Sequence, residues 1–166
     1  IEQRKKESEA KGRLRGLGLC YYIESILGDP SEEAKVVFEE DGSVKIFVGT
    51  QSNGQGHETV VAQFLSDQTG IPTEKIIVVQ GDSDLIPRGG GTGGSRSVTV
   101  QNNATLATVE KIIQSFSQYL SEKLEVDIED IEFDDTSFRI KGSNYSPNAL
   151  EVAKMAYEDN RFDLLK

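Results

Sequence analysis

Residues 49–59 read GTQSNGQGHET, and residues 89–97 read GGGTGGSRS. Both stretches combine glycine with small polar side chains, and each precedes a segment with a helical pattern. Glycine permits positive φ angles and close backbone approach, so the N–H groups of such turns can point at a ligand oxygen. The start of a helix adds unpaired N–H donors and a partial positive charge. Two such turns predict a long, anionic, hydrogen-bonding ligand that is held at two points.

The composition limits the size of the domain and its partners. The chain has 166 residues, 36% of them hydrophobic, and a formal net charge of −10. This length fits one domain or a piece of a larger one. The acidic balance argues against binding to nucleic acid or anionic membranes, and no apolar run is long enough for a membrane span. We expect a solvated acidic face at Glu122, Glu125, Asp127, Glu129, Asp130, Glu132, Asp134 and Asp135.

Cys20 is the only cysteine, which excludes an intrachain disulfide and fits a reducing, cytoplasmic location. It lies in the apolar stretch 16–25, which we expect to be a buried strand, with Cys20 as a small buried side chain. Residues 1–11 are highly charged and predict a helix that has no N-cap. From this opening we expect the chain to begin inside a larger polypeptide.

The remaining pattern predicts alternating strands and helices. Residues 34–40 and 43–48 alternate in polarity about Asp41-Gly42, which is a strong hairpin signal. Gly70 is suited to end the helix before it. The other expected elements are helices at 57–68, 97–123 and 147–159, the last with Pro147 in its first turn, a strand at 75–80, and a hairpin of 130–133 with 137–141. The fold class is therefore α+β, a mixed β-sheet with packed helices.

Familiar nucleotide motifs do not explain the two glycine-rich turns. Neither Gly-Lys-Ser nor Gly-Lys-Thr occurs, which argues against a P-loop, and a Gly-x-Gly-x-x-Gly match within a run of glycines has little specificity. Gln55, between two glycines, can present its amide to a polar ring or an oxo group. Ser95, Arg96 and Ser97 suit phosphate oxygens, and we expect at least one serine also to cap the helix.

His57 is the only histidine of the chain. One histidine and one cysteine cannot supply three nitrogen or sulfur ligands to a metal. A Ser-His-acid triad needs a carboxylate that holds the histidine, and Glu58, the next residue in sequence, points in another direction on a helix. We therefore assign no catalytic residue and no metal ligand, and we expect His57 to be a helix residue that is hydrogen-bonded locally. Arg88 is expected to be a solvated charge.

Taken together, these motifs resemble the molybdenum-cofactor-binding large subunit of the xanthine dehydrogenase, aldehyde oxidase and aerobic carbon monoxide dehydrogenase family, close to its carbon monoxide dehydrogenase-like bacterial branch. The resemblance covers residues 10–120 and rests on the order and spacing of GRLRGLGL at 12–19, GQGHET at 54–59, GIP at 70–72, GDSD at 81–84 and GGSRS at 93–97. It implies that residues 1–166 are a single segment of a larger molybdenum-cofactor-binding domain.

The resemblance also implies a cofactor, molybdopterin with molybdenum, which in bacterial members usually carries a cytosine dinucleotide. The family's Gly-Gln-Gly turn lies against the pterin, and the residues with this implied role are Gly54, Gln55, Gly56 and His57. The family's serine-rich loop lies against the phosphate and nucleotide side, and the residues with that implied role are Gly94, Ser95, Arg96 and Ser97.

The implied reaction is hydroxylation at carbon, in which water supplies the oxygen and molybdenum accepts two electrons. The implied partners are a small-molecule substrate, the rest of the large subunit, and iron–sulfur and FAD groups on other subunits or domains. The family's general base, a glutamate in a Gly-x-Gly-Glu context, is absent, so we expect the chain to be inactive alone. Two alternatives stay open: a non-enzymatic domain that docks a partner through its acidic surface, and a generic nucleotide-binding domain.

Overall fold

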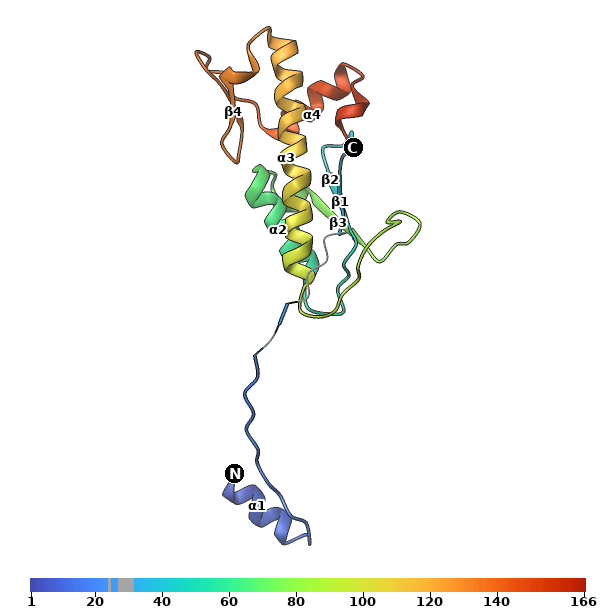
Figure 1. Cartoon of the computed structure of the whole chain (residues 1–166), viewed down its shortest axis with the longest axis vertical. Helices are drawn as coiled ribbons and strands as arrows, with labels where there is room; N and C mark the ends of the chain where they lie inside the picture. The colour runs from blue at the N-terminus through green and yellow to red at the C-terminus, as the bar shows by residue number, and fades with distance from the viewer. Residues whose placement is uncertain (24, 27–31) are drawn as a thin grey trace.

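The computed structural model describes residues 1–23, 25–26 and 32–166. Figure 1 shows the order of the elements along the chain. They are α1 (Glu2–Glu9), β1 (Ala34–Phe38), β2 (Val44–Val48), α2 (His57–Thr69), η1 (Thr73–Lys75), β3 (Ile76–Gln80), α3 (Ser97–Leu124), η2 (Ile128–Asp130), β4 (Ile131–Phe133), β5 (Phe138–Ile140), α4 (Ala149–Glu158) and η3 (Phe162–Leu164). The α+β class predicted from the sequence is confirmed. None of the described helices is long and apolar enough to cross a membrane.

A three-stranded mixed sheet forms the centre of the fold. β1 pairs antiparallel with β2, and β2 pairs parallel with β3, in the order β1-β2-β3. The predicted hairpin turn is confirmed: Gly42 has a φ of 80°, and the Asp41 carboxylate accepts the N–H of Ser43 at 2.9 Å. The parallel pair brings the carboxyl ends of β2 and β3 to the same edge of the sheet.

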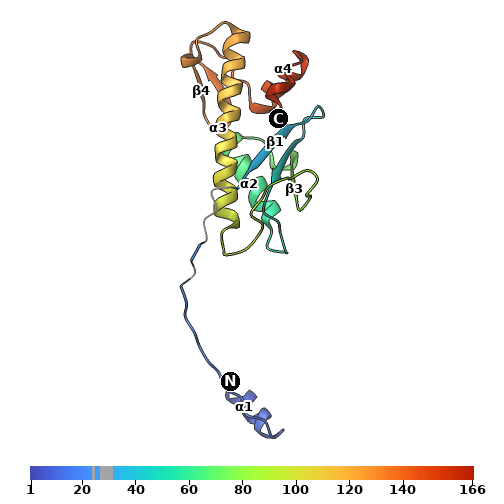
Figure 2. The same ribbon diagram turned by 45° about the vertical axis from the view of Figure 1, so that its right-hand side comes forward.

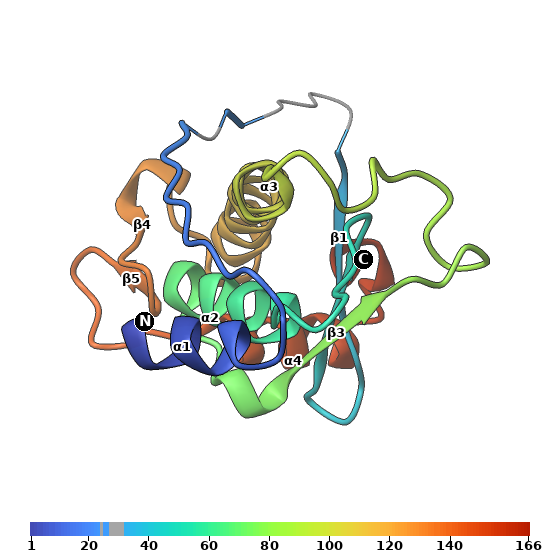
Figure 3. The same ribbon diagram turned by 90° about the horizontal axis from the view of Figure 1, so that it is seen from below.

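Helices α2 and α3 cover one face of this sheet, as Figures 2 and 3 show from two directions. Alternate strand residues point toward them and are buried, namely Val36, Phe38, Val44, Ile46 and Val48. Leu65 of α2 and Val109 of α3 meet them in the core. The two-residue period of the strands and the helical stripes therefore build one apolar layer between sheet and helices.

The second half of α3 packs against the C-terminal part of the chain. Phe116 lies 5.2 Å from Phe38 and 6.2 Å from Phe138 between ring centroids, so it joins the main sheet to the hairpin of β4 and β5. Helix α4 begins later than predicted, because Asn148 is its N-cap and forms a capping box with Glu151. Pro147 therefore precedes the helix instead of lying in its first turn.

The prediction of a buried strand at 16–25 is wrong for the residues that the structure describes, while residue 24 lies outside them. Tyr21 is 92% exposed and Ile23 98% exposed, and the segment has no strand assignment. The expectation that Cys20 is buried is also wrong, because its side chain is exposed. A strand needs a paired neighbour, and an apolar composition cannot supply one. Figure 1 shows this segment, with the predicted helix α1, lying away from the sheet.

Candidate functional site

The two glycine-rich turns lie at one end of the fold. The first glycine loop (residues 49–56) connects β2 to α2, and the second glycine loop (residues 89–96) leads into α3. A hollow of about 230 Å³ lies between them, with Gly49, Gln51, Gly89 and Gly91 among its lining residues. Ligands of open sheets typically bind outside the carboxyl ends of the strands, which is where this hollow lies.

The two loops contact each other directly. A Cβ on Gly49 would lie only 2.5 Å from Cα of Gly89, so neither position has room for a side chain. The N–H of Gln51 donates to Oγ1 of Thr92 at 2.9 Å, and that hydroxyl donates back to the carbonyl of Gln51 at 2.5 Å. The first half of the first glycine loop is therefore joined to the first half of the second glycine loop, although the two loops are distant in sequence.

Two buried residues that the sequence did not single out as site residues support this junction. Oε1 of Gln101, a residue only 1% exposed, lies 3.4 Å from both N and Oγ1 of Thr50, and Nε2 donates to the carbonyl of Glu33 at 3.2 Å. Glu32 accepts the N–H of Gly90 at 3.0 Å. In the sequence, Gln101 is distinguished only as a polar residue within the predicted helix at 97–123.

The N–H groups of the first glycine loop converge on oxygen atoms. Oγ of Ser52 lies 3.3 Å from the N atoms of both Gly54 and Gly56, and Oε1 of Gln55 accepts the N–H of Asn53. The Gln55 side chain is exposed and turned back onto its own loop. The amides of the loop therefore bond to the loop's own side chains, and a ligand oxygen would receive these N–H groups only where those side chains turn away.

His57 is the first residue of α2 and is buried. Its Nδ1 has no hydrogen-bond partner among the described residues, so the expected local hydrogen bond is not found for that atom. The neighbouring Glu58 is exposed and its pKa lies below the ordinary range, first because its own backbone N–H donates to the carboxylate and also because Gln80 does. The start of α2 therefore already holds a negative charge.

The second glycine loop has a different electrostatic character. Gly94 and Ser95 both have positive φ angles, 61° and 52°, and this conformation is uncommon for serine. Arg96 is the N-cap of α3, its guanidinium donates to the carbonyl of Gly90, and no acid lies in the first turn. Ser97 is buried as the first helical residue. The N-cap residue makes no side-chain capping bond to the start of α3, so the serine cap that we expected is not found.

Three buried side-chain atoms lack a hydrogen-bond partner within the part of the chain that the structure describes. They are Oε1 of Glu32, Nδ1 of His57 and Oδ1 of Asn102. All three belong to residues at the loop end: Glu32 contacts the second glycine loop, His57 begins α2, and Asn102 lies near the start of α3. Buried polar atoms in proteins are nearly always hydrogen-bonded, so each of these three atoms needs a partner beyond the described residues, such as water or a ligand.

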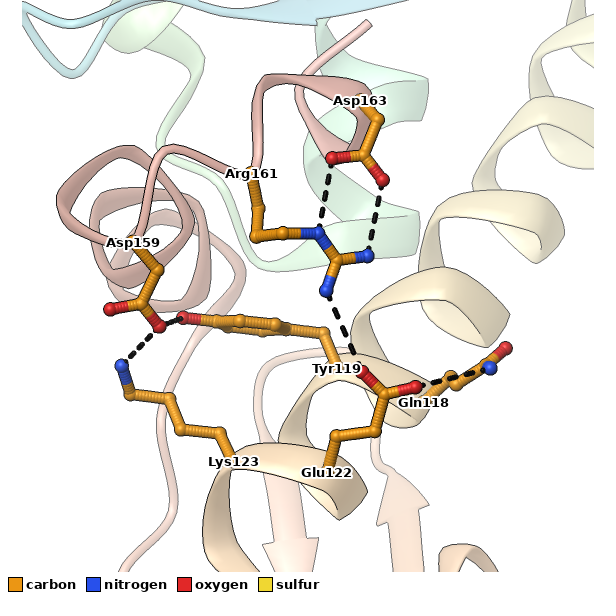
Figure 4. Close-up of polar contacts among 7 residues, drawn as sticks. All are labelled: Gln118, Tyr119, Glu122, Lys123, Asp159, Arg161 and Asp163. Carbon is orange, nitrogen blue, oxygen red and sulfur yellow. Dashed lines mark hydrogen bonds and ion pairs between the residues drawn. The ribbon is translucent and has the colours of Figure 1, made fainter.

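A second polar cluster lies at the opposite end, where α3 meets the C-terminal segment (Figure 4). The hydroxyl of Tyr119 donates to Asp159 at 2.6 Å, and Lys123 pairs with the same carboxylate at 2.5 Å. These contacts, Lys123 first, hold the pKa of Asp159 below its ordinary value. Arg161 pairs with both Asp163 and Glu122. Because these charges are mutually paired, the cluster fastens the C-terminal segment to α3.

Other features do not compete as sites. A larger hollow of about 750 Å³ lies between α4 and the turn after β1, and neither glycine loop contributes to its lining. The acidic face is mostly solvated as predicted, although Asp130 pairs with Lys141 and Asp134 with Arg139. Arg88 is exposed as expected but lies 3.5 Å from Glu33. No group of three metal-ligating side chains is found among the described residues.

Comparisons with known proteins agree on one family. The family model of the molybdopterin cofactor-binding domain matches residues 1–164. The carbon monoxide dehydrogenase large chain of Afipia carboxidovorans is 34% identical over 155 residues, which cover 85% of this chain and 19% of that protein. The nicotine 6-hydroxylase large subunit of Paenarthrobacter nicotinovorans is 31% identical over 172 residues, which cover 95% of this chain and 21% of that protein.

A solved structure of similar fold points the same way. The crystal structure of the Cu,Mo-CO dehydrogenase in its carbon monoxide reduced state aligns with a TM-score of 0.72 and 36% identity, over 76% of this chain and 16% of that one. The chain spans about a fifth of the length of the curated relatives just described. With the family model matched along almost its whole length, the chain belongs to the molybdopterin cofactor-binding domain family.

Proposed function

We propose that the two glycine loops hold a molybdenum cofactor of the molybdopterin cytosine dinucleotide type within a larger dehydrogenase. The proposed pterin contacts are Gly54, Gln55, Gly56 and His57. The proposed contacts to the phosphate and nucleotide side are Gly94, Ser95, Arg96 and Ser97. The observation that carries the proposal is the direct junction of the two loops, where Oε1 of Glu32 is buried without a hydrogen-bond partner among the described residues.

The first glycine loop fits a pterin ring. A pterin presents a carbonyl oxygen and ring nitrogens together with N–H donors, so it can both accept and donate hydrogen bonds. The loop offers donors in the amides of Asn53, Gly54 and Gly56, which now contact only side chains of the same loop. The amide of Gln55 and Nδ1 of His57, which has no partner among the described residues, would complete both kinds of bond.

The charge distribution supports the proposed direction of the cofactor. Glu58 lies at the start of α2, and its carboxylate would repel a phosphate placed there. The start of α3 has no acid in its first turn and has Arg96 at its N-cap, although the Glu32 carboxylate, bonded to the N–H of Gly90, also lies at the second loop. Anionic groups are stabilised at helix N-termini and by guanidinium groups. The phosphates are therefore proposed at the second loop and the uncharged ring at the first.

Within this proposal, the residues of this chain bind and orient the cofactor and exclude water from part of it. When bound, the cofactor would supply molybdenum-centred two-electron oxidation for hydroxylation at carbon. The proposal also includes the partners of this chain, which are the rest of the large subunit, iron–sulfur and FAD groups and a small-molecule substrate. It further includes a relationship to aldehyde oxidases and a cytoplasmic location. A general base is assigned to no residue of this chain.

The test is the cofactor content of the full-length protein. Gln55→Ala and Ser95→Ala should each lower the molybdenum and pterin bound per polypeptide, because each removes a proposed contact. The matched controls are Gln63→Ala, on the exposed surface of α2, and Ser115→Ala, far along α3 from the loops. Unchanged cofactor content in both loop variants would remove the proposal.

A further inference from the structure

Glu32 lies at the junction of the two glycine loops although it belongs to neither. Its side chain is buried, with 8% of the residue exposed, and Oε2 accepts the N–H of Gly90 at 3.0 Å. The next residue, Glu33, is exposed and pairs with Arg88. Because two adjacent glutamates differ so clearly in burial, the position of Glu32 calls for a specific explanation.

The carboxylate of Glu32 fills the space that the two glycines leave open. A Cβ on Gly49 would overlap Oε1 of Glu32 as well as the backbone of Gly89. Oε1 is buried and has no hydrogen-bond partner among the described residues. Burying a carboxylate oxygen without a partner is costly. A residue that only needed to fill this volume would be apolar, so the charge itself must serve the junction.

Gly90 is held at both of its polar groups. Its N–H donates to Glu32, and its carbonyl accepts from the guanidinium of Arg96. Both bonds involve a charged side chain, and such bonds are stronger than neutral ones. Since Gly90 has no side chain of its own, its orientation depends on these two contacts. Glu32 is thereby connected to Arg96 through a single residue.

We propose that Glu32 is a positioning residue for a phosphate at the second glycine loop. Glu32 holds Gly90 in place, and the carbonyl of Gly90 in turn orients the guanidinium of Arg96 toward that phosphate. The inference rests on the proposed function for its phosphate end, but the connection from Glu32 to Gly90 can be tested without a ligand. The structure assigns no proton transfer and no catalytic step to Glu32.

The first experiment measures hydrogen exchange in the cofactor-free, full-length protein, in peptides covering residues 86–95. Glu32→Ala should speed exchange at Gly90 on the order of tenfold, because a charge-assisted hydrogen bond is lost. Glu32→Gln keeps an acceptor oxygen and should restore most of the protection. Glu33→Gln is the matched control and should leave exchange unchanged. Unaltered exchange in Glu32→Ala would overturn the inference.

The second experiment measures how long the cofactor is retained by Glu32→Ala, Arg96→Ala and the double variant. If Glu32 acts through Arg96, its substitution should speed cofactor loss on the order of tenfold alone and add little in the Arg96→Ala background. Full additivity, or unchanged retention in Glu32→Ala, would refute the positioning role. If Glu32→Ala fails to fold, Glu32→Asp replaces it in both experiments, because the shorter side chain withdraws the carboxylate by one methylene.

The two experiments separate the inference from the proposed function. Faster exchange in Glu32→Ala, together with unchanged cofactor content in Ser95→Ala and Arg96→Ala, would contradict the phosphate site and with it the assigned purpose of Glu32. In that case the contact between Glu32 and Gly90 would still stand as part of the loop junction. Normal exchange with reduced cofactor content in Ser95→Ala would leave the site standing and remove Glu32 from it.

Discussion

The two ends of the molecule, which the long helix α3 connects, differ in how many of their polar groups have hydrogen-bond partners. At the C-terminal end, α4 begins with a full capping box of Asn148 and Glu151. At the loop end, α2 and α3 begin with Gly56 and Arg96 as N-caps, and neither supplies a side-chain cap. Helix N-termini leave N–H groups that need acceptors, so the loop end keeps donors that α4 has already used.

The same difference holds for buried side chains. At the C-terminal end, Tyr119, Lys123 and Asp159 form a closed set of contacts. The loop end instead holds the three atoms without partners, on Glu32, His57 and Asn102. One end is therefore stabilised by contacts among its own residues, whereas the other holds polar groups for which the described residues supply no partner.

The largest effect is expected from Phe116→Ala in the core that joins both halves. Phe116 is fully buried between Phe38 and Phe138, so its truncation should lower the free energy of unfolding by about 3–5 kcal/mol. Urea unfolding followed by circular dichroism measures this. Phe162→Ala, in which the same atoms are removed from a side chain 48% exposed, is the control and should cost far less. Equal losses would contradict the assignment of the core.

Gly49→Ala should disturb the loop end with little effect on the other end. The added methyl group would overlap Gly89 and Glu32, and relief requires the loops to separate, at a cost of about 1–3 kcal/mol. We expect loss of bound cofactor in the full-length protein and faster hydrogen exchange in both loops. Peptides from α4 should exchange as in the parent protein.

The control for this variant lies in the second loop itself. A Cβ on Gly93 would meet nothing within 4 Å, and its φ is not in the left-handed region. Gly93→Ala should therefore keep both the cofactor and the slow exchange. If the two alanine variants behave alike, the close approach of Gly49 and Gly89 does not decide the geometry of the loops.

Sequence reasoning succeeded where the signal is local. Alternation about Asp41-Gly42 predicted the hairpin, and Gly70 ends α2 with a φ of 69°, as expected. These features depend on residues within a few positions of one another, where turn chemistry and side-chain period act directly. The buried strand at 16–25 was wrong, because burial depends on a neighbour that the local pattern does not contain.

The connections within the candidate site were beyond sequence reasoning for the same reason. Thr50 and Gln101 are separated by 51 positions, and Glu32 and Gly90 by 58. Nothing in either pair's local sequence marks the contact, which arises only after the sheet and α3 have formed. The glycine-rich motifs indicated where a ligand would be held, but the residues that hold the loops together became visible only in the structure.

Gln101→Leu tests the contribution of such a hidden contact. The substitution keeps the approximate volume but removes both hydrogen-bonding groups, which leaves Thr50 and the carbonyl of Glu33 without this partner. Stability should fall by about 1–3 kcal/mol, measured by urea unfolding. Gln114→Leu, at an exposed position of the same helix, is the matched control. A loss no larger than that of the control would show that the bridge from α3 to the first loop carries little energy.

The smallest effect is expected from Asp159→Asn at the C-terminal end. Contacts with Lys123 and Tyr119 lower the pKa of Asp159 in the folded protein, so its stabilising effect is present above the ordinary carboxyl pKa and is lost as the pH falls through the lowered value. The melting temperature of the variant should therefore lie slightly below that of the parent protein at pH 7. The difference should disappear in acid, where the parent carboxyl is also neutral.

Because the Asp159 side chain is 40% exposed, solvent screens the pair and the shift should stay small. A gap that persists undiminished in acid would mean that Asp159 acts through its shape and not its charge, and the closed set of contacts at this end would have to be assigned to packing.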